Sequence, residues 1–593
     1  MKSANSTKSG QAVSIGSAVS VIVLCGVLLL APGCKQDDPE SAGTEVAPEE
    51  TVVISLETTF QGLRPDEFEI IVPRDRPTSD LNEWGDEMLA DMLDPEVDEK
   101  ELSKALAKLL PAEVVERTLR PEFVLRDSNH VRDCLWAREV TDSVTKTSES
   151  ELDAVVDLFY FVTNTVHVVP AAESLPFGPF ETALYGFGTA EDRAWMFATL
   201  LRQRRIPTVV FVANQLADED QLAGEAEGAE SSGGKLSSVT KNLLVGALLN
   251  EAIYLFDAGL GLPIVSPDEQ VASALVRRPA TLQQAIAEPS VLAGMGAAET
   301  LPYAITTEQL KKLQPQIVGD SSVWSRRMEG LRNGQPVDIK AIIFEPLVSS
   351  GPFKGLVDLV SEHVSKVLPE TGVGVWLYPE RQREARETVS KDKDQSARLA
   401  SLNDTFKVPQ PVRVGLAADE QNPGQQKLEF VFGTSWGTHR GGRINQILGR
   451  PEEAIPAYLN VQTWRTMPPS PKDEHIAPEL KDAAVQQLPE DVKRRHLNAA
   501  EEALIWRATC QIQKGAYSSA AVDLEGYLRQ LATRTYSGQF RNEANYLAGI
   551  SLALSGNSRR GAAFLRKVDP EDSRHDVSQW LINRWAAQNE KAE

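Results

Sequence analysis

The most constraining feature of this 593-residue chain is a segment in which a helix pattern is followed at once by a strand pattern. Apolar residues recur at the helical spacing i, i+3, i+4 and i+7, at Ala194, Phe197, Ala198 and Leu201. Pro207 ends that helix, and the next residues, 208–212, are β-branched or aromatic and predict a strand. The segment therefore predicts a helix that leads directly into a sheet.

The surrounding residues extend this pattern. A second amphipathic helix is predicted by Leu152, Val155, Val156 and Phe159. Two further strands are predicted over 243–249 and 252–256, joined at Asn250-Glu251, and residues 215–241, rich in Asp, Glu, Gly, Ala and Ser, predict a mobile loop insertion. The chain is thus expected to be a multidomain α+β protein.

The residues around the first of these helices resemble the nucleophile segment of transglutaminase-like domains. The resemblance lies in Gly188-Thr189-Ala190-Glu191-Asp192-Arg193-Ala194, Leu200-Leu201-Arg202 and Ile206-Pro207. In that family a cysteine stands twelve positions before the arginine and opens the helix, whereas this chain has Ala190 there. The resemblance covers roughly residues 126–290 and implies a papain-like core of helix and antiparallel sheet.

The same resemblance implies positions for the rest of the family's Cys-His-Asp triad. Asp257 ends a predicted strand before Gly259 and Gly261, like the family's aspartate, and about fifteen residues earlier Asn242 stands where the histidine is expected. The seven histidines are His130, His167, His363, His439, His475, His496 and His575. None lies between Ala190 and Asp257, so the resemblance implies an inactive cleft and not an enzyme.

Several nearby residues have a structural and a functional interpretation. Asp192 and Arg193 could bind a ligand, but acidic residues early in a helix favour a cap. Asp257 without its imidazole is expected to be a strand-end turn former or a buried hydrogen-bond acceptor. Cys134, with His130 or His167 as base, is the alternative nucleophile, although free cysteines most often pack as small hydrophobes, and His167 is expected to be a strand residue.

Composition excludes other classes of function. The formal net charge of −23 repels phosphate backbones, so we expect no nucleic-acid partner. Outside the N-terminal segment only Cys134 and Cys510 remain, which give no zinc spacing and at most one disulfide. No motif predicts a metal or a cofactor.

The N-terminus has the order of zones found in export signals. Lys2 and Lys8 precede an apolar run over 13–30, which ends at Gly33-Cys34. This resembles a bacterial lipoprotein signal over 1–34, in which Cys34 is acylated and anchors the chain to a membrane; an uncleaved span and simple secretion are the alternatives. Residues 35–50 predict an acidic tether, and the expected location is the bacterial cell envelope, facing the periplasm or the exterior.

The remaining regions are assigned from composition and repeats. We expect an N-terminal α/β region over 51–125, with a helix near 100–117; an unrecognised α/β region over 291–380; and a charged linker over 381–429, whose first part could instead be a surface helix. Over 430–593, Gly449, Gly515 and Gly556 each have a small residue seven before and five after, and Tyr458, Leu524 or Leu565 nine after. This pattern resembles tetratricopeptide-type helical repeats, in which glycine makes the turn and small residues let helices approach.

Three functions fit these observations. The first is a catalytically inactive transglutaminase-like envelope lipoprotein that binds a protein or peptide partner through its C-terminal repeats. The second is an active cysteine-dependent amidase or protein-glutamine acyltransferase with a displaced nucleophile such as Cys134. The third is a structural spacer. The expected site residues are the triad positions Ala190, Asn242 and Asp257, together with lipidation at Cys34.

Overall fold

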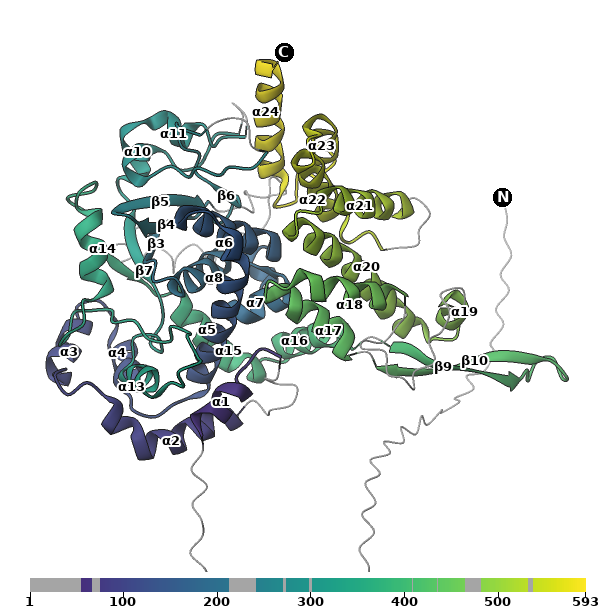
Figure 1. Cartoon of the computed structure of the whole chain (residues 1–593), viewed down its shortest axis with the longest axis horizontal. Coiled ribbons are helices and arrows are strands. Elements are labelled where there is room, and N and C mark those ends of the chain that lie inside the picture. Colours follow the sequence, from purple (N-terminus) through teal and green to yellow (C-terminus); the bar gives the residue numbers. More distant parts are fainter. Residues whose placement is uncertain are drawn as a thin grey trace, which may run out of the picture. The chain divides into compact units, whose positions relative to one another are not determined.

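The computed structural model describes residues 55–66, 75–212, 242–269, 274–297, 301–407, 409–434, 436–463, 481–531 and 537–592. It is an α+β protein with a mixed sheet and many helices (Figure 1). Cys34, the acidic tether and the predicted insertion over 215–241 lie outside these residues. Within the described ranges, no helix has both the length and the apolarity needed to span a bilayer.

A six-stranded sheet organises the centre of the chain. Its strand order is β6-β5-β4-β3-β7-β8, and all neighbours are antiparallel except β7 and β8. The strands are β3 (Thr208–Val212), β4 (Leu244–Leu249), β5 (Ala252–Asp257), β6 (Leu262–Pro263), β7 (Gln314–Val318) and β8 (Gly374–Trp376). The three strands predicted from sequence are confirmed, and Asn250 and Glu251 form the β4–β5 turn with positive φ angles of 49° and 66°.

Four helices pack with this sheet in one hydrophobic core. They are α5 (Leu125–Val144), α6 (Glu151–Thr165), α7 (Pro179–Tyr185) and α8 (Ala190–Arg202). The predicted apolar face of α8 is buried, because Ala194, Phe197, Ala198 and Leu201 are each at most 3% exposed. A two-stranded parallel sheet, β1 (His167–Val168) with β2 (Phe187–Gly188), lies just before α8 in the chain and confirms His167 as a strand residue.

The N-terminal region differs from its prediction. The described part of 51–125 contains only helices: α1 (Leu56–Gly62), α2 (Arg76–Met92), α3 (Glu99–Leu106) and α4 (Ala112–Leu119). The single helix expected near 100–117 is two helices, because Pro111 cannot continue a helix and instead precedes the first turn of α4.

The domain boundary placed at residue 290 is also wrong. Strands β7 and β8 come from the unrecognised region 291–380, yet they extend the same sheet beyond β3. The helices of this part of the chain are α10 (Leu282–Ala287), α11 (Pro289–Ala293), α12 (Thr307–Leu310), α13 (Arg326–Gly334) and α14 (Leu356–Val364). Sheet pairing between distant segments leaves no local signal in the sequence, so the boundary could not be seen there.

The region 381–429 is not a linker. It contains most of α15 (Tyr378–Thr388), all of α16 (Lys393–Thr405) and most of a β-hairpin, β9 (Pro409–Ala418) with β10 (Gln426–Thr434). The surface-helix alternative is correct for α16, which buries no described residue. In α15, however, Glu380 and Arg383 are only 2% and 5% exposed, because their charges are paired with other buried charges.

The C-terminal part consists of paired helices joined by glycine turns. The pairs are α17 (Trp436–Ile447) with α18 (Pro451–Thr463), α20 (Glu490–Gln513) with α21 (Tyr517–Leu531), and α22 (Arg541–Leu554) with α23 (Ser558–Leu565); α19 (Lys481–Gln486) and α24 (His575–Ala592) complete the region. Gly449, Gly515 and Gly556 lie between paired helices with positive φ angles of 69°, 74° and 90°, as the pattern predicted.

The predicted close approach of paired helices is confirmed in the last pair. A Cβ atom on Gly561 would lie 2.5 Å from the carbonyl oxygen of Gly549, so neither helix leaves room for a larger residue. The expected gap-filling residues Tyr458, Leu524 and Leu565 are all fully buried.

These helices do not stand apart from the sheet domain. Apolar residues of α17, α18 and α20 belong to the same core as α5–α8, and residues of α22–α24 share a second core with the sheet. The α17 residue Arg443 donates hydrogen bonds to the carbonyl oxygens of Leu184 and Ala183 at the end of α7. The inner side of the helical array therefore packs against the protein's own core.

Candidate functional site

The first triad position, Ala190, opens helix α8. Thr189 is the N-cap: its hydroxyl accepts a hydrogen bond from the Asp192 amide at 3.2 Å, and the Asp192 carboxylate accepts one from the Thr189 amide at 2.8 Å. This reciprocal pair is a capping box, which confirms the structural interpretation of Asp192. Burial raises the pKa of Asp192 to about 6, against hydrogen bonds from Thr189 and Tyr378 that lower it.

Asn242 and Asp257, the other two triad positions, are in direct contact. The Asn242 Nδ2 atom donates to Asp257 Oδ2 at 2.6 Å. In the family that the sequence resembles, this is the relationship of the histidine to its aspartate. The structure thus brings these two residues together at the start of β4 and the end of β5, where the family resemblance implies a contact.

Asp257 is fully buried and receives hydrogen bonds on both carboxylate oxygens. Besides Asn242, Tyr303 donates its hydroxyl to Oδ2 at 2.6 Å, and the amides of Leu260 and Leu243 donate to Oδ1 at 2.8 and 3.4 Å. Burial raises the pKa of this carboxyl group, and these hydrogen bonds oppose the shift. Asp257 is therefore a buried acceptor that holds the end of β5, and Tyr303 is a partner that the sequence did not reveal.

Arg193, one turn into α8, does not cap this helix but joins it to other segments. Its guanidinium group is buried and donates to the carbonyl oxygens of Val166 and Ala258, at 2.6 and 3.1 Å. It thus ties α8 to the end of α6 and to the turn after β5. Ala190 belongs to the same core as Leu243 and Ala258, which follow the other two triad positions in the chain.

The chemistry available at the triad positions is limited. A methyl group is no nucleophile, and a carboxamide neither takes up nor releases a proton near neutral pH. Asp257 could orient an imidazole, but its oxygen is occupied by the amide of Asn242.

Cys134, the alternative nucleophile, lies within α5 and is fully buried. Its sulfur is 3.6 Å from Nε2 of His130, so the predicted i, i+4 contact exists. Burial raises the pKa of the thiol to about 12 and lowers the pKa of His130, so the neutral thiol and neutral imidazole are favoured at pH 7. Cys134 and Cys510 are both free, so the disulfide between them does not form.

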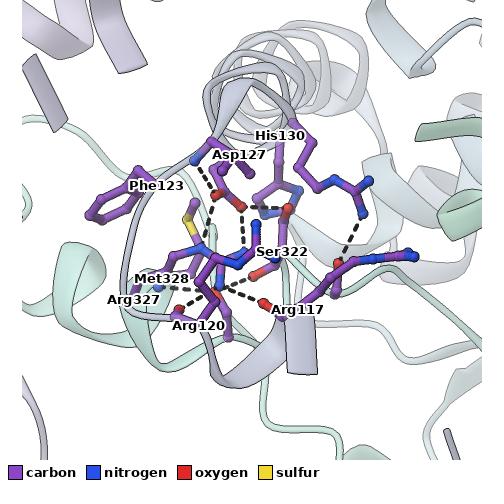
Figure 2. Close-up of polar contacts among 12 residues, drawn as sticks. Arg117, Arg120, Phe123, Asp127, His130, Ser322, Arg327 and Met328 are labelled. Atoms are coloured by element: carbon purple, nitrogen blue, oxygen red, sulfur yellow. Dashed lines mark hydrogen bonds and ion pairs between the residues drawn. The ribbon is translucent and has the colours of Figure 1, made fainter. Parts of the chain in front are cut away.

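The helix that carries Cys134 begins in a network of buried charges (Figure 2). Asp127 accepts two hydrogen bonds from Arg327, at 2.8 and 2.9 Å, and a third from Ser322 at 2.7 Å. Nearby, Arg383 joins Asp133 and Asp320 at 2.8 and 3.2 Å. Burial alone would raise the pKa of Asp320, but the charge of Arg383 and the other groups around it lower it to about 2. The charges around α5 are thus paired within the protein, and the fully buried thiol has no access to substrate.

A cavity of about 290 Å³ lies between the parallel strands β1 and β2, helix α16 and the C-terminal helices. We call it the junction cavity. Its wall includes five aromatic side chains: Tyr185, Phe187, Phe406, Trp506 and Phe540. Two arginines, Arg443 and Arg574, and three carboxylates, Glu502, Glu543 and Asp572, also line it. These residues come from distant parts of the chain, so no local pattern in the sequence predicts the cavity.

Three polar atoms of the junction cavity have no hydrogen-bond partner among the described residues. They are the Thr165 hydroxyl, Nδ1 of His167 and Nη1 of Arg574. Thr165 and Arg574 are 5% and 6% exposed. Burial, followed by the charges of Arg574 and Arg193, lowers the pKa of His167 well below its usual range, so its imidazole is neutral at pH 7.

No protein-family model, curated protein or solved structure matches this chain. Within the described part of the chain, no group of three or more His, Cys, Asp or Glu side chains is placed to hold a metal ion. Function is therefore inferred from the geometry of the triad positions and of the junction cavity.

Proposed function

We propose that this chain is a non-catalytic binding protein of the bacterial cell envelope, built on a transglutaminase-like domain whose triad has been replaced. The observation that carries the proposal is the Asn242–Asp257 hydrogen bond of 2.6 Å. It reproduces the expected histidine–aspartate contact with a side chain that cannot transfer protons, while Ala190 opens the helix where the nucleophile is expected.

Binding involves the C-terminal helical pairs in this proposal, which resemble tetratricopeptide-type repeats. Their inner side packs against the protein's own core, so a protein or peptide partner would use their outer surface or the junction cavity. The lipid anchor at Cys34 would hold the domain at the membrane.

A thiol-reactive amide-mimic probe, incubated with the full chain in mild detergent, tests the absence of catalysis. We expect no labelling of Cys134 in the folded protein, because the thiol is buried and protonated at pH 7. The same chain in denaturant is the positive control, and Cys134→Ala identifies the labelled site. Stoichiometric labelling of folded protein, abolished by a competing amide, would support the displaced-nucleophile enzyme instead.

The packing of the repeats against the sheet domain also favours a second candidate, a structural spacer. Crosslinking in the native envelope separates the two proposals. A binding protein yields a recurrent partner crosslinked through residues 430–593, whereas a spacer yields none.

A further inference from the structure

A hollow of about 400 Å³ lies where the last turns of α5 and the end of α8 meet residues 340–342. We call it the basic hollow. Its charged lining residues are Arg138, Asp142, Arg204, Arg205 and Lys340. Four basic side chains and one acidic side chain give the lining a formal charge of +3, whereas the whole chain has a net charge of −23. The overall composition therefore does not explain this local positive charge.

Hydrogen bonds hold the three segments of the basic hollow together. The side-chain carboxamide of Gln203, the residue after α8, accepts from the Ile342 amide at 2.8 Å and donates to the Ile342 carbonyl oxygen at 3.1 Å. The Gln203 carbonyl oxygen accepts from Nη1 of Arg138 in α5 at 3.2 Å. Arg204 donates to the Thr145 hydroxyl at 3.1 Å. The backbone that carries the two arginines after α8 is therefore fixed between α5 and the segment that carries the lysine.

The accessible cations of the basic hollow have no carboxylate partner. Arg205 and Lys340 are exposed, and Arg204 is partly exposed. None of these three side chains forms an ion pair with a described carboxylate. Arg138 and Asp142, by contrast, pair with each other at 2.7 Å. A solute that enters the hollow therefore meets three positive charges that no described side chain neutralises.

The backbone of Arg205 indicates that its side chain has a role beyond the fold. Its φ angle of 58° lies in the left-handed region, which glycine adopts freely and residues with a Cβ atom adopt at a cost. The dipole of α8 favours a cation just after the helix, which accounts for Arg204. It does not account for an arginine at position 205 with a strained backbone, or for Lys340, which belongs to another segment.

The positive charges in this region also repel one another. Burial lowers the pKa of the Arg332 guanidinium, and the positive charge of Arg205 lowers it further. An anion in the basic hollow would relieve this repulsion, because it places a negative charge beside Arg205.

The charge of the basic hollow suits a phosphate group. A phosphate monoester has a charge of about −1.5 to −2 at pH 7 and three strong acceptor oxygens. A single carboxylate brings one charge and two oxygens, which leaves more of the lining charge unpaired. Guanidinium groups match phosphate oxygens in a forked geometry, and a lysine binds phosphate as a point charge. Asp142 opposes an anion only weakly, because its charge is already paired with that of Arg138.

We infer that the basic hollow binds a phosphate group, with Arg204, Arg205 and Lys340 as its donors. A volume of about 400 Å³ lies in the lower part of the range of ligand sites, which fits a small ester or a headgroup. The phosphate belongs to a soluble ester or to a phospholipid. This site is formed by α5, α8 and residues 340–342, so it is independent of the partner proposed for the C-terminal helices.

Isothermal titration calorimetry on the full chain in mild detergent tests the site. The buffer contains about 20 mM NaCl, because salt screens exposed charges. One probe is the soluble ester α-glycerophosphate, for which we expect a Kd of roughly 0.1–1 mM. The second is the water-soluble short-chain lipid dihexanoyl phosphatidic acid, with titration into protein-free detergent as its blank. The third is citrate, an anion that has carboxylates and no phosphate.

Three variants and one control complete the test. Arg205→Gly removes a cation and the strained backbone, so it should weaken binding about tenfold without lowering the melting temperature. Lys340→Gln should weaken binding about fivefold. Asp142→Asn removes the acidic charge of the lining and should tighten binding about threefold, a gain that misfolding cannot produce. Lys108→Gln changes an exposed cation that does not line the hollow, and its Kd should stay within about twofold of wild type.

The outcomes separate the alternatives. If Arg205→Gly weakens binding, a lower Kd for the short-chain lipid than for α-glycerophosphate identifies a headgroup site, and any other order identifies a site for soluble esters. Both results support the inference. Tighter binding of citrate than of either phosphate would overturn the phosphate chemistry. Absence of binding, or equal Kd values for wild type, Arg205→Gly and Lys340→Gln, would overturn the site itself.

Discussion

Buried polar groups are paired at the triad positions, whereas some of those in the junction cavity are not. At the triad positions Asp257 collects four hydrogen bonds, and each donor comes from the protein itself. In the junction cavity three polar atoms are buried without a partner among the described residues. The first arrangement is that of a structural core, since satisfied polar groups rigidify a fold. The second leaves buried polar atoms unsatisfied, which lowers stability. The triad positions are therefore a self-sufficient part of the core, whereas the junction cavity carries the cost of unsatisfied polar groups.

The largest expected effect comes from removing the acceptor at the triad positions. Asp257→Ala leaves the Tyr303 hydroxyl, the Asn242 amide and two backbone amides without their partner in a buried site. We expect the free energy of unfolding to fall by about 4 kcal/mol, measured by urea denaturation. Asp86→Ala, at an exposed position of α2, is the control and should change it by less than about 0.5 kcal/mol. A loss below about 1 kcal/mol for Asp257→Ala would show that Asp257 does not hold this region together.

The second largest effect is the pH dependence of the free energy of unfolding that Asp192, at the start of α8, is expected to cause. The pKa of Asp192 rises to about 6 in the folded state. Between pH 4 and 6 the Asp192 carboxyl group therefore keeps its proton in the folded protein but loses it in the unfolded chain. The contribution of this group to stability is therefore complete below about pH 4 and is lost as the pH rises to about 6. We expect the stability of wild type relative to Asp192→Asn to fall by about 3 kcal/mol over this range and to stay constant above pH 7.

Asp86→Asn controls for a general change in net charge. Parallel stability curves for wild type and Asp192→Asn from pH 4 to 7 would contradict the raised pKa of Asp192.

A smaller effect on the free energy of unfolding, a possible increase, is expected for a substitution in the junction cavity. Thr165→Val removes a hydroxyl with no partner, so the free energy of unfolding should stay unchanged or rise by up to about 1 kcal/mol. Thr509→Val removes a hydroxyl that has a partner and should lower it by about 0.5–1 kcal/mol. Thermal and urea unfolding of the two variants measure the difference. If Thr165→Val is the more destabilised variant, its hydroxyl has a structural partner and the comparison between the two regions fails.

The smallest effect on stability is expected from a disulfide that tests whether Ala190 lies close to Asn242. In the double variant Ala190→Cys with Asn242→Cys, the resemblance predicts Cα atoms within about 7 Å, the reach of a disulfide. We expect the bond to form on mild oxidation. The stabilisation by the disulfide is offset by the loss of the Asn242 hydrogen bond to Asp257, so the free energy of unfolding should change by less than about 1 kcal/mol. Non-reducing electrophoresis after alkylation detects it, and each single variant is the control. If both introduced cysteines stay reduced after oxidation, Ala190 lies outside the site.

Sequence alone determined the local elements and the missing chemistry. The spacing of apolar residues marked α6 and α8, β-branched residues marked β3, and glycines marked the turns between paired helices, because each depends on neighbours within a few residues. No histidine stands between Ala190 and Asp257 in the sequence, which excludes a triad base in this interval.

Only the tertiary structure decided the rest. Pairing of β7 with β3 extends the sheet across the expected boundary. The charges of α15 are buried because they pair with residues of other segments, namely Asp133, Asp320, Arg126 and Arg117. Tyr303 reaches Asp257 from 46 residues away, and the junction cavity draws its wall from residues 164 to 574. Such contacts depend on which surfaces meet after folding, and no periodicity or spacing in one segment records the partner that another segment supplies.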